Sequence, residues 1–211
     1  MMESMIHEPS LAAIRQALGR PSPGRVAQMR MSTRPRPGLE ARSPGHQPRQ
    51  GGVLILLYPK DGCLHFPLTR RTETLEDHKG QISLPGGARE GDEPLEWTAL
   101  RETYEELGVD PQSVEVLSAL TPLYIFPSDY CITAYVATRP DRPTFVPDPA
   151  EVAEVLEVPL LILLDPAMRR EEERVLHGTT ARVPFYRIGE HKVWGATAMV
   201  LSEFVVVLGG Q

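Results

Sequence analysis

Residues 87–109 read GAREGDEPLEWTALRETYEELGV, and this stretch says more about the fold than any other part of the chain. It places Glu102, Glu105 and Glu106 at positions i, i+3 and i+4, so on an α-helix the three carboxylates share one face. Carboxylates at this spacing repel one another and disfavour the helix. A hard cation that takes oxygen ligands, such as Mg²⁺, would offset the repulsion. The spacing therefore predicts a helix face that holds a metal.

The residues around the glutamates predict where this helix begins and ends. Pro94 suits a first helical turn, and Asp92 or Glu93 can cap the positive end of the helix. Gly108 stands where a C-terminal capping glycine belongs. A mostly apolar stripe, about 120° from the carboxylates by the 3.6-residue period, predicts the side that packs on a core. The stripe consists of Ala99, Leu100, Thr103 and Leu107.

The whole segment has a recognisable pattern, Gly87-x5-Glu93-x7-Arg101-Glu102-Thr103-x-Glu105-Glu106-x-Gly108-Val109. This pattern resembles the Nudix box, and it departs at Thr103, where that family has a large aliphatic residue. Thr103 lies on the predicted core side, so the departure concerns packing more than chemistry. The resemblance implies an α+β fold, a Nudix-like α/β/α sandwich with a mixed β-sheet. It also implies a phosphoanhydride hydrolase that depends on Mg²⁺ or Mn²⁺.

The resemblance also implies roles for individual residues of the box. Glu102, Glu105 and Glu106 would hold the metal ions, with the carbonyl of Gly87 as a further ligand. Arg101 would orient these carboxylates, pairing with Glu93. The general base stays open between one of the three glutamates and a downstream acid, for which Glu151 and Glu154 are candidates.

A second motif stands directly before the box, over residues 68–87. It resembles the upstream signature of the coenzyme A pyrophosphatase branch of Nudix hydrolases, which implies cleavage of coenzyme A or its oxidised or acyl forms to 3′,5′-ADP and a 4′-phosphopantetheine product. The alternatives are another nucleoside diphosphate derivative, such as ADP-ribose or a dinucleoside polyphosphate, and a non-catalytic nucleotide-binding module. The matching residues are Leu68, Thr69, Arg71, Gly80, Pro85, Gly86 and Gly87. The departures are Thr72, Glu76 and Leu84.

Cations in this second motif suit a polyphosphate substrate whatever the family. Arg gives bidentate contacts to phosphate, so Arg70 and Arg71, with Lys79 and Gly80 in the following loop, are the predicted substrate-binding residues. His78 is interpreted as a hydrogen-bonding loop residue. His65, within a strand pattern, is interpreted as structural.

Composition limits the classes of partner. The first 50 residues hold eight Arg and three acidic residues, so the rest of a chain with net charge −6 carries −11. An acidic domain does not favour general nucleic-acid binding. The sequence has no apolar run long enough for a membrane span and no signal-peptide pattern. Two cysteines without metal-like spacing, Cys63 and Cys131, favour buried free thiols in a reducing cytoplasm.

The remaining pattern predicts a domain over 51–211 preceded by an extension over 1–50. The extension is expected to hold a short helix at 8–19 and then a Pro- and Arg-rich irregular arm at 20–49, loosely docked and compatible with a homodimer. Its scattered acids are not expected to bind metal. Expected strands are 53–58 and 64–69 as a hairpin, 114–124, 130–138, 171–176, 182–188 and 192–194. A short helix or loop is expected at 150–156, followed by an apolar run at 158–164, and a terminal helix at 195–208.

Overall fold

Strand β1 (Arg49–Lys60) lies at the centre of the larger sheet, and its side chains fill the core on both faces. Successive side chains of a strand point to opposite faces. Leu54 and Leu56 join the apolar cluster around helix α3 (Leu95–Leu107), while Ile55 and Leu57 join the cluster around helix α5 (Gly195–Val207). All four are fully buried. Burial on both faces explains why this strand reads as a continuous apolar run. The computed structural model describes residues 7–35, 46–72, 80–176 and 178–210.

The larger sheet is mixed. Its main order is β3-β2-β1-β7-β5, and β4, β6 and β8 pair with β1, β7 and β2. The β1–β7 pair is parallel and the other pairs are antiparallel. The strands other than β1 are β2 (Cys63–Arg71), β3 (Ile82–Ser83), β4 (Gly86–Ala88), β5 (Glu115–Ala119), β6 (Leu123–Ile125), β7 (Tyr130–Thr138) and β8 (Val152–Pro159).

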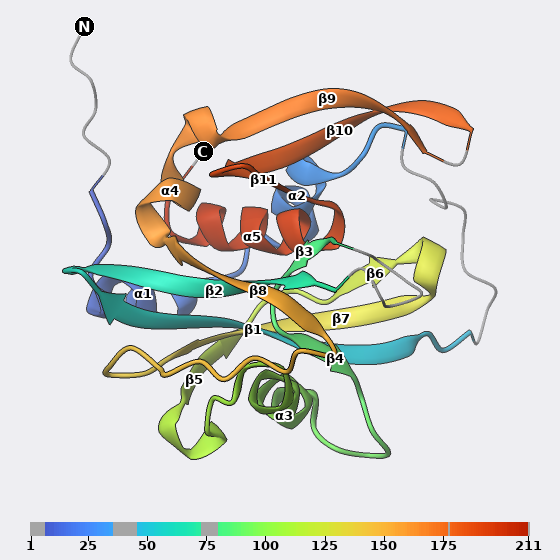
Figure 1. Cartoon of the computed structure of the whole chain (residues 1–211). Coiled ribbons are helices and arrows are strands. Elements are labelled where there is room, and N and C mark those ends of the chain that lie inside the picture. Colours follow the sequence, from blue (N-terminus) through green and yellow to red (C-terminus); the bar gives the residue numbers. More distant parts are fainter. Residues whose placement is uncertain (1–6, 36–45, 73–79, 177, 211) are drawn as a thin grey trace, which may run out of the picture.

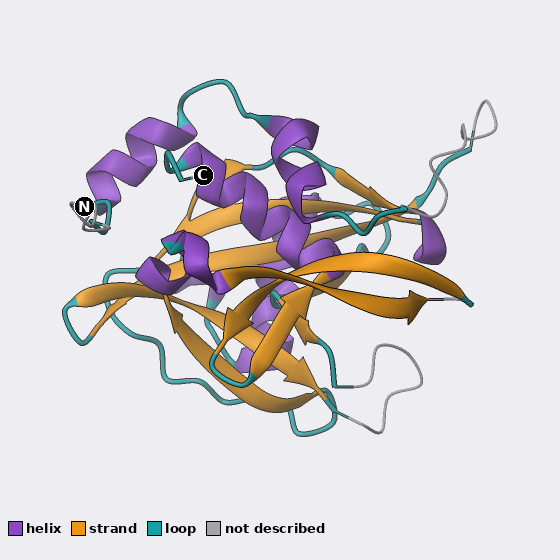
Figure 2. Cartoon of the chain, turned by 90° about the horizontal axis from the view of Figure 1, so that it is seen from above, coloured by secondary structure: helices purple, strands orange, loops and turns teal. Residues whose placement is uncertain are grey.

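A smaller antiparallel sheet of β9 (Arg169–Leu176), β10 (Thr179–Ile188) and β11 (His191–Trp194) lies beyond α5. Figure 1 shows the layers in order: α3, the larger sheet, α5, and then β9 and β10. The predicted α+β sandwich is therefore confirmed, and the small sheet adds a layer outside α5. Seen from above in Figure 2, the helices on the α5 side of the larger sheet cross the strands beneath them.

Short-range patterns were reliable for the hairpin and the two long helices. β1 and β2 pair with Lys60 opposite Cys63, across a turn in which Asp61 and Gly62 both have positive φ, as a two-residue hairpin turn requires. Helix α3 ends at Gly108, which adopts the left-handed conformation. The expected terminal helix is α5. Pro94 precedes α3 as its N-cap residue and does not lie in the first turn.

The N-terminal segment packs on the domain, which corrects the prediction of a loosely docked irregular arm. The predicted first helix is present as α1 (Leu11–Leu18), capped by Ser10. Residues 24–31 then form α2 (Gly24–Gln28) and a 3₁₀ turn, η1 (Met29–Met31). Ile14 and Met31 are fully buried in the same cluster as α5. Burial of these apolar side chains against α5 stabilises the docked segment, although its proline content predicted an irregular arm.

Polar contacts also tie this segment to α5, through Glu203, a fully buried glutamate. Its carboxylate accepts from the Gln28 side-chain amide at 2.7 Å and from the Thr121 backbone N–H at 3.0 Å. It also accepts from the Ser22 hydroxyl. The hydroxyl of Ser202 donates to the Ala27 carbonyl at 2.8 Å. α5 thereby joins the N-terminal segment to the β5–β6 connection.

Two further predictions were wrong in detail. Residues 152–159, expected to begin as a short helix or loop, form strand β8, which pairs with β2 from His65 opposite Pro159 to Arg71 opposite Val152. Pairing with a strand that is distant in sequence determines that such a segment becomes a strand, and its local composition does not. The expected strand at 114–124 is two strands, β5 and β6. The apolar run after β8 forms a short helix, α4 (Leu160–Leu164), and 3₁₀ turns occur at η2 (Pro111–Ser113), η3 (Phe126–Ser128) and η4 (Pro166–Met168).

Both cysteines are free thiols, as predicted, although they are half-buried and not buried. None of the helices in the described part of the chain combines the length and the apolar character that a bilayer crossing needs.

Candidate active site around helix α3

Helix α3 lies very close to the sheet, and this fixes the position of its acidic face. A Cβ added at Gly52 of β1 would lie 2.3 Å from the Leu95 carbonyl oxygen and 2.9 Å from the Ala99 backbone nitrogen. Only glycine allows the two backbones to approach in this way. Ala99, Thr103 and Leu107 of the predicted stripe are buried against the sheet, whereas Leu100 is half-buried and packs against the same cluster. The hydroxyl of Thr103 donates to the Ala99 carbonyl, so the unusual residue of the box is satisfied within the helix.

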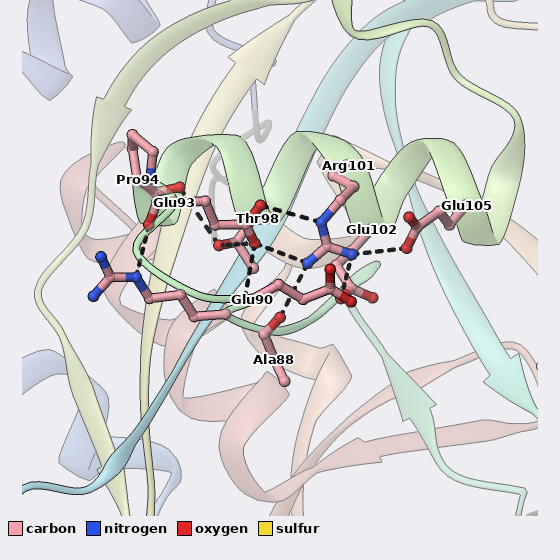
Figure 3. Close-up of polar contacts among 9 residues, drawn as sticks. Ala88, Glu90, Glu93, Pro94, Thr98, Arg101, Glu102 and Glu105 are labelled. Atoms are coloured by element: carbon pink, nitrogen blue, oxygen red, sulfur yellow. Dashed lines mark hydrogen bonds and ion pairs between the residues drawn. The ribbon is translucent and has the colours of Figure 1, made fainter.

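Arg101 is the centre of the polar network on this helix. Figure 3 shows its guanidinium among Glu93, Glu102 and Glu105. Nη2 lies 2.9 Å from Glu93 Oε1, and Nη1 lies 2.9 Å from Glu102 Oε1 and 2.8 Å from Glu105 Oε2. Nη2 also donates to the Ala88 carbonyl at 3.1 Å. The predicted pairing of Arg101 with Glu93 is therefore confirmed, and the guanidinium touches two of the three glutamates expected to hold metal.

Glu93 binds Arg101 and does not cap the helix. Its carboxylate also accepts from the Thr98 hydroxyl at 2.8 Å and the Glu90 backbone N–H at 3.1 Å. The hydrogen bond from Arg101 lowers the pKa of Glu93 to about 2. A carboxylate held ionised in this way fixes the guanidinium in one orientation. Glu93 and Arg101 thus form a rigid clamp beside the acidic face.

Glu106 is the most deeply buried acid of the box, with 5% of its surface exposed. Burial raises the pKa of Glu106 to about 8. The charge of Arg71 and a hydrogen bond from the Gly86 backbone N–H oppose this shift, and the charges of Glu151 and Glu102 add to it. Its Oε2 atom is buried and has no hydrogen-bond partner among the described residues. A buried carboxylate oxygen without a partner is costly unless a cation or a proton meets it.

Glu102 lies against the backbone of strand β4. A Cβ added at Gly87 would fall 2.4 Å from Glu102 Oε2, so glycine at 87 leaves the space that this carboxylate occupies. Burial raises the pKa of Glu102, and the neighbouring Arg101 opposes that shift. Glu102 and Glu106 therefore both favour a nearby positive charge, which would keep them ionised.

These observations fit a divalent cation held by the acidic face. The donors are carboxylate oxygens, which Mg²⁺ and Mn²⁺ prefer, and Glu106 Oε2 is a buried oxygen with no other described partner. The carboxylate of Glu105, which like Glu102 is paired with Arg101, differs because it is half exposed. Within the described ranges, no three His, Cys, Asp or Glu side chains are gathered into a ready metal cluster. The assignment of all three glutamates and the Gly87 carbonyl as ligands stays a prediction.

The predicted substrate-binding residues are only partly brought to this site. Arg71 is close enough to act on the charge of Glu106, and its Nε atom is buried with no hydrogen-bond partner among described residues. Arg70 instead pairs with Glu154, with Nε and Oε2 2.9 Å apart. Gly80 has a positive φ at the end of the loop. Lys79 and His78 lie outside the described residues.

The two candidate bases differ in their surroundings, and a histidine that the sequence analysis did not predict lies near one of them. Glu154 is paired with Arg70, whereas Glu151 is exposed and its charge acts on both Glu102 and Glu106. His191 of β11 lies with Nε2 3.7 Å from Glu154 Oε1. No motif marks His191, because it meets Glu154 of β8 only through the tertiary packing of the small sheet. His65 is buried and stacks on Tyr58, in agreement with a structural role.

Comparisons with known proteins agree with this geometry. A family model described as NUDIX domain matches residues 48–177. The chain is 38% identical over 172 residues to the chloroplastic Nudix hydrolase 22 of Arabidopsis thaliana, covering 77% of this chain and 56% of that protein. It therefore spans little more than half of that plant relative. It is 37% identical to the Nudix hydrolase NudL of Photorhabdus laumondii over 74% of this chain and 82% of that protein.

Among solved structures, the MutT protein of Methanosarcina mazei Go1 superposes with a TM-score of 0.51 at 17% identity, covering 80% of this chain and all of that one. At this level of identity the superposition supports the fold alone.

Proposed function

This chain belongs to the NUDIX domain family, and from that premise we propose that it is a metal-dependent phosphohydrolase whose substrate is coenzyme A or one of its oxidised or acyl forms. The products would be 3′,5′-ADP and a 4′-phosphopantetheine compound. The observation that carries the proposal is the buried Oε2 of Glu106, which has no hydrogen-bond partner among the described residues and lies near Glu102 on the helix of the box. A bound Mg²⁺ or Mn²⁺ supplies the charge that stabilises a phosphoanhydride undergoing hydrolysis.

The side chains divide the remaining work. Glu102 and Glu106 would hold the metal, and the half-exposed Glu105 would join them. Arg101, fixed by Glu93, keeps the carboxylates on one face of α3. Its role is positioning, because it contacts these side chains from the edge of the site. The proposed general base remains one of the glutamates of α3 or a downstream acid, Glu151 or Glu154. The charge of Glu151 acts on both Glu102 and Glu106.

The choice of coenzyme A rests on the motif at 68–87 and on the position of its arginines. Arg71, at the end of β2, acts on the charge of Glu106, and its Nε lacks a partner among described residues. It is therefore available for a phosphate oxygen next to the metal-binding face. The Nε of Arg70 is paired with Glu154. We retain it as a substrate-binding residue on the basis of the motif.

A substrate panel tests both parts of the proposal. Coenzyme A, ADP-ribose and a dinucleoside tetraphosphate are incubated separately with Mg²⁺ and Mn²⁺, and products are separated by chromatography. We expect the highest kcat/KM with coenzyme A. A marked preference for ADP-ribose or the dinucleotide would replace the substrate and keep the reaction class. Tight binding without cleavage under any condition would indicate a nucleotide-binding module in place of an enzyme.

The variant Glu106→Gln tests the assignment of the site. It removes the charge and keeps the size, so we expect kcat to fall by about 100-fold or more at saturating metal. Glu96→Gln is the matched control, because Glu96 is an exposed acid on the same helix outside the acidic face. Unchanged metal-dependent turnover in Glu106→Gln would refute the assignment.

A further inference from the structure

A hollow of about 800 Å³ lies between the α2–η1 segment and the small sheet. The segments that line it lie on the α5 side of the larger sheet, whereas α3 covers the opposite face (Figure 1). The lining residues are Val26, Met29, Arg30, Arg34, Arg169, Arg170, Glu171 and Pro184. The volume falls within the range of sites that take small ligands. The hollow plays no part in the chemistry proposed for α3.

The hollow is strongly basic in a chain whose net charge is −6. Its four arginines and one glutamate leave a local charge of +3. The glutamate, Glu171, is paired with Arg34 at 2.7 Å. The guanidinium groups of Arg30 and Arg170 form no hydrogen bond or ion pair with any residue that the structure describes. Two neighbouring guanidinium groups with no described counter-charge disfavour the fold, and an anionic ligand would offset that cost.

The arginines are held in place by the backbone. Arg34 and Arg182 of β10 exchange two backbone hydrogen bonds, each of 2.9 Å, which fix the N-terminal segment to the small sheet. Met31, next to the lining residue Arg30, is fully buried in the core. Two segments far apart in sequence therefore present their guanidinium groups to one space from anchored main chain. A site that is largely formed in advance loses less entropy on binding.

Part of the wall of the hollow is apolar. Val26 is 78% exposed, and Met29 and Pro184 line the same hollow. Guanidinium groups bind phosphate oxygens with two parallel hydrogen bonds, whereas an apolar wall suits an organic group. A ligand that combines both parts, a phosphorylated small molecule of nucleotide size, matches this lining better than a bare inorganic anion does.

We propose that this hollow is a second ligand site, which binds a phosphorylated small molecule through Arg30 and Arg170 and is separate from the acidic face of α3. The site requires no hydrolysis of its ligand. It would remain if the substrate proposed for α3 were wrong, because it shares no residue with that site.

Calorimetric titration of the full chain with ADP, in EDTA to prevent turnover, tests the proposal. The variant Arg30→Gln/Arg170→Gln removes both unpaired guanidinium groups. Arg25→Gln is the control, since Arg25 is an exposed arginine of α2 outside the hollow. Both substituted positions of the double variant are exposed, so we expect it to fold. Urea unfolding of the double variant checks this. We expect the double variant to lose a set of ADP sites, with affinity there lowered by about tenfold or more, and the control to match wild type.

A parallel titration with inorganic pyrophosphate distinguishes the two sources of phosphate chemistry. Weaker binding of pyrophosphate than of ADP, with the same dependence on Arg30 and Arg170, supports recognition of an organic phosphate. Equal binding of the two supports the anion site but overturns the role of the apolar wall. ADP binding that is identical in wild type and the double variant refutes the site. Binding of a short single-stranded oligonucleotide that needs both arginines, when ADP binding does not, would replace the small molecule with nucleic acid.

Discussion

Replacement of Glu203 tests how firmly the N-terminal segment is tied to the rest of the domain. The variant Glu203→Leu keeps the approximate volume of the side chain and removes its three hydrogen bonds. The Gln28 amide and the Thr121 backbone N–H, which now donate over 2.7 and 3.0 Å, would lose a buried acceptor. Each buried donor left unsatisfied costs about 1–3 kcal/mol. We therefore expect the free energy of unfolding to fall by about 2–6 kcal/mol.

Urea unfolding of wild type, Glu203→Leu, Gln28→Leu and the double variant measures this cost and its source. The two single variants should be coupled by about 1 kcal/mol or more, because each removes one end of the same hydrogen bond. Glu173→Leu is the control, since Glu173 is exposed on β9. A loss below about 1 kcal/mol in Glu203→Leu, or strict additivity with Gln28→Leu, would refute the reasoning.

Three other predictions follow from particular contacts. Hydrogen bonds, the strongest from Arg142, lower the pKa of Glu157 to about 2, so the stabilisation by the ionised Glu157 should be complete above the ordinary glutamate pKa and lost as the pH falls towards 2. Urea midpoints of Glu157→Gln should therefore vary less with pH in that acidic window than those of wild type. Identical profiles would contradict the assignment. Gly87→Ala should lower kcat with little change in stability, because the new Cβ meets the flexible end of Glu102. Gly52→Ala should be strongly destabilising, because the new Cβ meets the backbone of α3. Equal unfolding midpoints for the two variants would contradict this. Deletion of residues 1–45 should lower the unfolding temperature through the loss of Ile14 and Met31 from the core but leave metal-dependent hydrolysis measurable; complete loss of turnover in a folded truncated protein would place the segment in the active site.

Local patterns in the sequence were enough to predict the helix of the box and the hairpin. The period of α3 determines that Ala99, Thr103 and Leu107 face the core and that the glutamates share another face. The Asp61–Gly62 pair determines the turn between β1 and β2, because both residues tolerate positive φ. Such features depend on residues a few positions apart, so their physical causes are contained in short stretches of the chain. The family could be identified from the same stretch.

Only the tertiary structure decided which partner each charged side chain meets. Glu105 contacts Arg101, and Glu106 is buried beside Arg71, although the two glutamates are adjacent in the sequence. The N-terminal segment becomes part of the core because α5, far along the chain, supplies Glu203 and an apolar surface. The basic hollow likewise forms where Arg30 and Arg170 converge from segments that carry no common motif. Contacts of this kind depend on the packing of distant elements, since burial and charge act through space and have no fixed spacing along the chain.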